Sequence, residues 1–87
     1  MGAIKVQVKD VANFFDNLCG FDYRVVADFY DKDGYYIGQV DKNYKDAHLV
    51  ISSELRGVWK SEVLFHCMNT MRDTVMFKFI VLKGEEK

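Results

Sequence analysis

The hydrophobic pattern changes its period close to the start of the chain. Apolar and polar positions alternate over residues 4–8, which predicts a short strand with one buried face. Apolar side chains then recur at the spacing of one helical face, at Val11, Phe14, Phe15 and Leu18. Asp10 is a suitable N-cap and Gly20 a suitable residue to end the last turn. The pattern therefore predicts a helix over Val11–Cys19.

The segment that follows alternates strictly between two kinds of side chain. Its odd-numbered positions are all apolar or aromatic, which predicts a strand whose core-facing side consists of Phe21, Tyr23, Val25, Ala27 and Phe29. Residues 31–34 read Asp-Lys-Asp-Gly, and Gly34 can supply the positive φ of a tight hairpin turn. The return strand is expected over Tyr35–Val40.

The register of this hairpin leaves two alternatives open. Either Tyr30 or Asp31 faces Tyr35, and the two choices turn different side chains inward. Gly38 in the return strand indicates a bulge or a close approach of another segment.

The second half of the chain contains one ambiguous segment. A polar connection over residues 41–46, a short strand over Ala47–Ile51 and a polar bend over residues 52–54 are expected. Residues 61–72 fit either a strand that pairs with the next one or a helix capped by Ser61. Thr74–Lys83 is rich in aromatic and β-branched residues and predicts a well-buried strand.

These elements predict an α+β fold in a single domain over residues 1–87. We expect an antiparallel β-sheet with an N-terminal helix packed on one face. The alternative is a ferredoxin-like split βαβ arrangement with a second helix near residues 61–72. The hairpin is favoured, because residues 59–67 and 75–81 offer matching apolar faces across one loop.

Composition and charge exclude several classes of protein. Eighty-seven residues supply one core, and 12 Lys and Arg against 13 Asp and Glu give a net charge of −1. A non-specific nucleic-acid binder needs an excess of cations, which this chain lacks. No apolar run is long enough to cross a bilayer and no signal segment is evident, so we expect a cytoplasmic protein without a membrane partner.

Candidate catalytic and metal-binding groups do not have the spacing that such chemistry needs. Glycine comes fourth after Asp31 and Lys42 occupies the twelfth position, so the segment fails as a calcium loop. The soft ligands are not arranged in close pairs as in zinc sites; they are Cys19, Cys67, His48 and His66. Cys67 with His48 as base has no supporting motif around it. We therefore expect no enzyme activity, no metal and no cofactor. The two cysteines are expected to be reduced and buried, as free cysteines usually are, and a single disulfide between Cys19 and Cys67 is the alternative.

Aromatic density is the unusual feature of the chain. Nine of its thirteen aromatic residues lie between Phe14 and Tyr44, and a domain of this size cannot bury them all. Residues 1–43 carry five Lys and Arg against seven Asp, so the aromatic half is also the acidic half. This combination predicts a surface that binds a protein partner with a basic surface, formed by Tyr30, Asp31, Asp33, Tyr35, Tyr36, Asp41 and Tyr44.

Two other functions belong to different classes. Aromatic residues on a sheet bind single-stranded nucleic acid when cations lie beside the rings, which is not the pattern here. A structural or oligomerisation role is the other alternative. The Val75–Leu82 segment is apolar on both faces apart from Lys78, so it would pair with a second copy if it formed the edge of the sheet.

The opening of the chain carries a resemblance to a known group of proteins. Its sequence from Val8 to Phe15, VKDVANFF, resembles the start of small phage and mobile-element accessory proteins, anti-CRISPR proteins among them. The segments Arg24-Val25-Val26 and Asp33-Gly34-Tyr35 and the closing strand fit the same loose pattern. The resemblance implies a stoichiometric inhibitor or regulator of a host protein, and it assigns a role to no individual residue.

Overall fold

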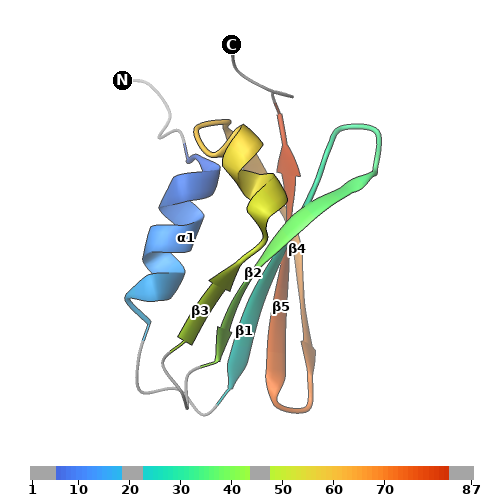
Figure 1. Cartoon of the computed structure of the whole chain (residues 1–87). Coiled ribbons are helices and arrows are strands. Elements are labelled where there is room, and N and C mark those ends of the chain that lie inside the picture. The colour runs from blue at the N-terminus through green and yellow to red at the C-terminus, as the bar shows by residue number, and fades with distance from the viewer. Residues whose placement is uncertain (1–5, 19–22, 44–47, 83–87) are drawn as a thin grey trace, which may run out of the picture.

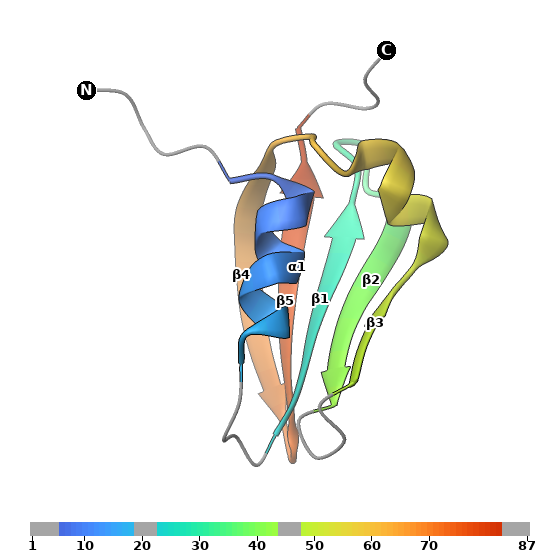
Figure 2. The same cartoon turned by 60° about the vertical axis from the view of Figure 1, so that its left-hand side comes forward.

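The fold is a single five-stranded sheet with helices on one side of it. The computed structural model describes residues 6–18, 23–43 and 48–82. In chain order the elements are α1 (Val8–Asp16), β1 (Arg24–Tyr30), β2 (Tyr36–Asn43), β3 (His48–Ile51), the 3₁₀ helix η1 (Ser53–Val58), β4 (Val63–Met71) and β5 (Thr74–Val81). Figures 1 and 2 show α1 and η1 on the same face of the sheet. The predicted α+β class with an N-terminal helix on the sheet is confirmed.

The sheet is mixed, so the prediction of a purely antiparallel sheet is wrong. Its strand order is β3-β2-β1-β5-β4, and β1 and β5 pair in parallel at its centre. The other neighbouring strands pair antiparallel. β5 is apolar on both faces, which suits a central position between two strands. The condition for pairing through Val75–Leu82 is therefore not met, because β4 and not β5 forms the edge of the sheet.

Residues 61–72 contain a strand, and the helix expected in the split βαβ alternative is wrong. β4 pairs with β5 from Val63 opposite Val81 to Met71 opposite Thr74, and a bulge interrupts the register at His66. The connecting turn holds Arg72 at φ 51°. Each strand gains a complete partner in this hairpin, whereas an isolated amphipathic helix would have left one edge of β5 unpaired.

The helix α1 begins earlier than its hydrophobic spacing predicts. Gln7 is its N-cap and Val8 its first residue, so the strand predicted over residues 4–8 does not extend to Val8. Gln7 forms a single antiparallel bridge with Glu62, and residues 4 and 5 lie outside the described part of the chain. The helix ends at Asp16, and Cys19 and Gly20 also lie outside the described residues.

Backbone groups from a distant segment explain the early start of α1. The amides of Val8 and Lys9 donate to the carbonyls of Ser61 and Trp59, at 3.1 and 2.9 Å. These contacts satisfy two of the amides that a helix N-terminus leaves without partners. Asp10, predicted as the N-cap, instead occupies the third helical position, where its carboxylate accepts from the amide of Gln7 at 2.9 Å.

The core lies between the sheet and its two helices. It consists of Val8, Val11, Ala12, Phe15, Val25, Ala27, Phe29, Val40, Leu55, Val58, Val63 and Val81. The predicted core-facing alternation of β1 is confirmed at Val25, Ala27 and Phe29, whereas Tyr23 precedes the strand and is exposed. Phe21 lies outside the described residues.

A buried lysine holds the C-terminal end of α1 on the sheet. Lys42 is 4 % exposed, and its ammonium donates to the carbonyl of Asp16 at 3.2 Å. The carbonyls at a helix C-terminus carry partial negative charge and favour a cation there. Lys42 belongs to β2, so this contact holds the end of α1 on the β2 side of the sheet. The strand β2 itself continues to Asn43, and the polar connection expected from residue 41 onward therefore starts later than predicted.

Gly38 is the residue of β2 on which η1 packs. A Cβ built at this position would lie 3.0 Å from Leu55 Cγ and 3.0 Å from Ser52 Cβ, which confirms the expected close approach. The expected bulge is also present, because the register shifts between Phe29, opposite Gly38, and Tyr30, opposite Tyr36. The bend predicted over residues 52–54 is the start of η1.

Replacement of Gly38 should destabilise the fold. In Gly38→Ala the new methyl group must displace the buried side chain of Leu55, and we expect the free energy of unfolding to fall by about 1–3 kcal/mol. Gly57→Ala is the matched control. Gly57 lies in η1, the helix that packs on Gly38, but a Cβ at Gly57 meets no atom within 4 Å. Urea unfolding of both variants measures the difference, and equal stability of the two would contradict the packing described at Gly38.

Candidate functional site

The turn between β1 and β2 is held by the carboxylate of Asp31. Its Oδ1 accepts hydrogen bonds from the amides of Asp33 and Tyr35, both at 2.9 Å. The amide of Asp31 donates to the carbonyl of Tyr35 at 2.9 Å, so the second of the two expected registers is present. Gly34 has the predicted positive φ, at 92°. The Asp31 carboxylate therefore fixes the backbone conformation of the turn, and with it the positions from which the neighbouring side chains project.

Tyrosine side chains gather around this turn. Tyr35 is 71 % exposed and Tyr36 is 55 % exposed. The rings of Tyr30 and Tyr36 form an edge-to-face pair with centroids 5.5 Å apart, and Lys78 Nζ lies 5.7 Å from the centroid of the Tyr30 ring. Tyr30 alternates with the buried Phe29, so this pair stands on the face of the sheet opposite α1.

The surroundings of Tyr36 disfavour the charged form of its phenol. Partial burial and the nearby charge of Asp28 raise the pKa of Tyr36 above its ordinary value, and the Tyr30 phenol and Glu54 add smaller effects in the same direction. Asp28 is itself buried, and its Oδ1 accepts from the side-chain amide of Gln39 at 2.9 Å. Tyr36 is therefore a hydrogen-bond donor beside acidic groups at neutral pH.

The structure brings together five of the seven residues that the sequence proposes as a binding surface. They are the residues at the turn, Tyr30, Asp31, Asp33, Tyr35 and Tyr36. Asp41 lies about 17 Å further along β2 and is bound to Arg24 by two hydrogen bonds, Nε to Oδ1 at 3.0 Å and a second to Oδ2. These bonds raise the pKa of Arg24. Tyr44 lies outside the described residues.

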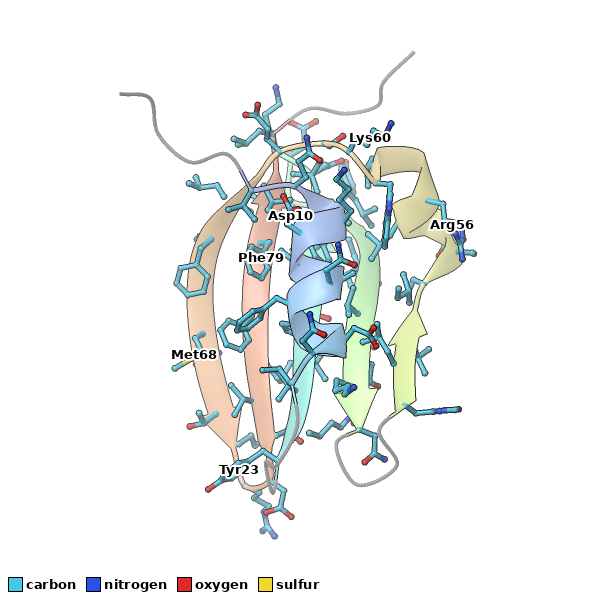
Figure 3. All side chains as sticks on the ribbon, turned by 90° about the vertical axis from the view of Figure 1, so that its left-hand side faces the viewer. Asp10, Tyr23, Arg56, Lys60, Met68 and Phe79 are labelled. Carbon is cyan, nitrogen blue, oxygen red and sulfur yellow. The ribbon has the colours of Figure 1, made fainter. Side chains whose placement is uncertain are left out.

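A second surface escapes the sequence analysis. Phe14, predicted to face the core, is 61 % exposed, and Phe65 and Met68 on β4 are 52 % and 51 % exposed. A groove of about 340 Å³ runs between α1 and β5, lined by Val6, Asp10, Val11, Phe14, Phe15, Phe77 and Phe79. Figure 3 shows Met68 projecting from β4 and Phe79 lying beside α1. The available signal was a second stripe at the same spacing, because Val8, Val11, Ala12 and Phe15 form the buried face of α1 and leave Phe14 beside it.

The residues weighed for catalysis or metal binding lie far apart. His48 is in β3 and Cys67 is in β4, the two opposite edges of the sheet, which are about 19 Å apart at ordinary strand spacing. The two side chains are therefore too far apart to act as a nucleophile and its base. Cys67 is a free, half-buried thiol. Within residues 6–18, 23–43 and 48–82, no group of three or more His, Cys, Asp and Glu is placed to hold a metal ion.

Comparisons with protein-family models, curated proteins and solved structures find no match to this chain. In the part of the chain that the structure describes, neither helix has the length and apolar character needed to cross a membrane.

The raised pKa of Tyr36 predicts a loss of stability in alkaline solution. The protonated phenol contributes stability below the ordinary pKa of 10.0, and this contribution is lost as the pH rises toward the higher pKa of the folded state. Urea unfolding between pH 8 and pH 11 should show a steeper loss of unfolding free energy in the wild type than in Tyr36→Phe. Identical losses in the two proteins would contradict this assignment.

Proposed function

We propose that this protein is a small, non-enzymatic protein-binding module that binds a partner through the tyrosines of its β1–β2 turn. The observation that carries the proposal is the exposure of Tyr35 and Tyr36, at 71 % and 55 %, on a turn held by two hydrogen bonds to Asp31. Tyrosine is enriched among the residues that dominate binding energy, because it brings a large contact area with few rotatable bonds.

The rigidity of the turn supports a role in binding. A contact surface that is already ordered loses less conformational entropy when a partner docks. The Asp31 carboxylate, the positive φ of Gly34 and the edge-to-face pair of Tyr30 and Tyr36 each restrict the turn before any partner arrives.

The charge around the tyrosines favours a partner with a basic surface. Asp31 and Asp33 lie in the turn, and Asp28 and Glu54 lie close enough to Tyr36 to raise its pKa. Lys32 and Lys78 offset part of this negative charge. Complementary charge would accelerate association and select against acidic partners more than it would strengthen the complex.

The biological setting of the proposal rests on the sequence alone. The resemblance of residues 8–15 to phage and mobile-element accessory proteins supports a cytoplasmic, stoichiometric inhibitor or regulator of a host protein. A stoichiometric inhibitor needs only a binding surface, which is the property that the turn provides.

The nucleic-acid alternative gains no support from the placement of the aromatic rings. Phe77 contacts Phe15 of α1 and Phe79 stacks on the core residue Phe29, so both face the helix and not the open side of the sheet. On the open side, Lys78 lies over the Tyr30 ring, but the buried carboxylate of Asp28 on the same strand offsets its charge, whereas a nucleic-acid site needs an excess of cations beside its rings.

Affinity capture with matched tyrosine variants tests the proposal. The protein is immobilised and exposed to a lysate of the cells that encode it, in parallel with Tyr35→Ala and Tyr23→Ala. Tyr23 is the control, because it is also exposed, at 46 %, and lies at the opposite end of β1. We expect Tyr35→Ala to lower recovery of the bound protein by about tenfold or more, as at a binding hot spot, and Tyr23→Ala to leave it unchanged.

Two results would contradict the proposal. One is equal recovery by the wild type and Tyr35→Ala, and the other is loss of recovery in Tyr23→Ala alone. Capture should also weaken as salt is added, because the attraction between the acidic turn and a basic partner is screened.

A further inference from the structure

The outer edge of β4 is unusually poorly protected against pairing with another strand. Within the described residues, no strand lies beyond β4 in the sheet order. Its nine residues, VLFHCMNTM, include no Lys, Arg, Asp, Glu or Pro, the residues with which proteins ordinarily protect such edges. The opposite edge, β3, has only four residues and offers a much shorter template. A bulge at His66 gives β4 some protection.

Large apolar side chains are exposed on both faces of this strand. Phe65 and Met68 stand opposite Phe79 and Phe77 on the α1 face, and are 52 % and 51 % exposed. Leu64 and Met71 are 57 % and 63 % exposed, and Leu64 stands opposite Ile80 on the other face. A ligand lying on one face would cover only half of this set. An added strand covers both faces, because its own side chains alternate.

The start of β4 shows that its outer edge accepts an antiparallel neighbour. Gln7 bridges Glu62 antiparallel, and the amide of Val63 donates to the carbonyl of Val6 at 2.8 Å. Beyond this bridge, the stretch from Leu64 to Met71 has no strand beside its outer edge in the described residues.

That stretch is complementary to itself when it runs antiparallel. His66 is the extra residue of the bulge, so it is left out of the register. A two-fold axis at Met68 then places Leu64 opposite Met71 of the second copy, and Met68 opposite Met68 of the second copy. The paired stretch contains no Lys, Arg, Asp or Glu, so no like charges meet along it. We propose that a second copy of this chain pairs with β4 in this way and forms one continuous sheet.

The exposed area predicts a weak dimer. Four side chains that are each more than half exposed contribute roughly 400 Å² per copy, about half of the ~800 Å² that each partner buries in a standard interface. The β1–β2 turn takes no part in this pairing, so a dimer would present two free turns. Dimerisation through β4 and partner binding at the turn can therefore be tested independently of each other.

Sedimentation of the full chain from about 10 μM to 1 mM, under reducing conditions, tests the pairing over the range expected of a small interface. We expect a concentration-dependent dimer in the wild type. Met68→Lys and Met68→Glu should each raise the dimer dissociation constant at least tenfold, because two like charges then meet at the two-fold axis. An equimolar mixture of the two variants should restore dimerisation, a result that a merely misfolded variant cannot give.

The control variants separate this edge from other surfaces. Val50→Lys adds the same charge to β3, where Val50 is 56 % exposed, and should leave the dimer intact. Phe14→Gln, in the groove beside α1, should also leave it intact. Loss of the dimer in either control but not in Met68→Lys would overturn the proposal, as would a monomer throughout the concentration range.

Hydrogen exchange gives a second measurement. The amides from Leu64 to Met71 that point away from β5 should become more protected as the protein concentration rises. Strong protection that does not depend on concentration would show that the chain covers its own edge and would overturn the proposal.

Discussion

The structure depends on how little of a five-stranded sheet one short helix can cover. α1 runs along the strands (Figure 2), so it covers a width of only about 10 Å, whereas the outer strands are about 19 Å apart. The position of α1 is set by the carbonyls of Trp59 and Ser61 at its start and by Lys42 at its end. Since Lys42 belongs to β2, the helix is drawn to that side, and the apolar side chains of β4 remain exposed.

The two surfaces that result are separate in space and in kind. The turn between β1 and β2 presents phenol rings beside carboxylates, a combination that suits a polar, basic partner. The edge of β4 presents unpaired backbone with uncharged side chains, which suits another strand. If both proposals hold, a dimer would engage a partner at two sites, and a divalent or symmetric partner would be bound more tightly than a single turn allows.

Local pattern predicted the elements well, and distant contacts explain what it missed. The helix, the β1–β2 turn with Gly34, and β3 follow from periodicity and turn chemistry over a few residues. The N-cap was misplaced, because the carbonyls that fix it come from residues 59 and 61. The parallel pairing of β1 with β5 was missed, because the hydrophobic pattern of a strand does not specify which strand lies beside it or in which direction that strand runs. The turn residues of the candidate site were predicted together for the same local reason, whereas Asp41 depends on the length of β2 and on Arg24.

The central claim, that the tyrosine turn is the surface that meets another protein, is most directly tested by mapping amide chemical shifts on the complex. Titration of the isotope-labelled protein with its captured partner should perturb the amides of residues 30–36 first and most strongly, with smaller changes at Asp28 and Glu54. Perturbations confined to α1 and β4, with the turn unchanged at saturation, would contradict the account.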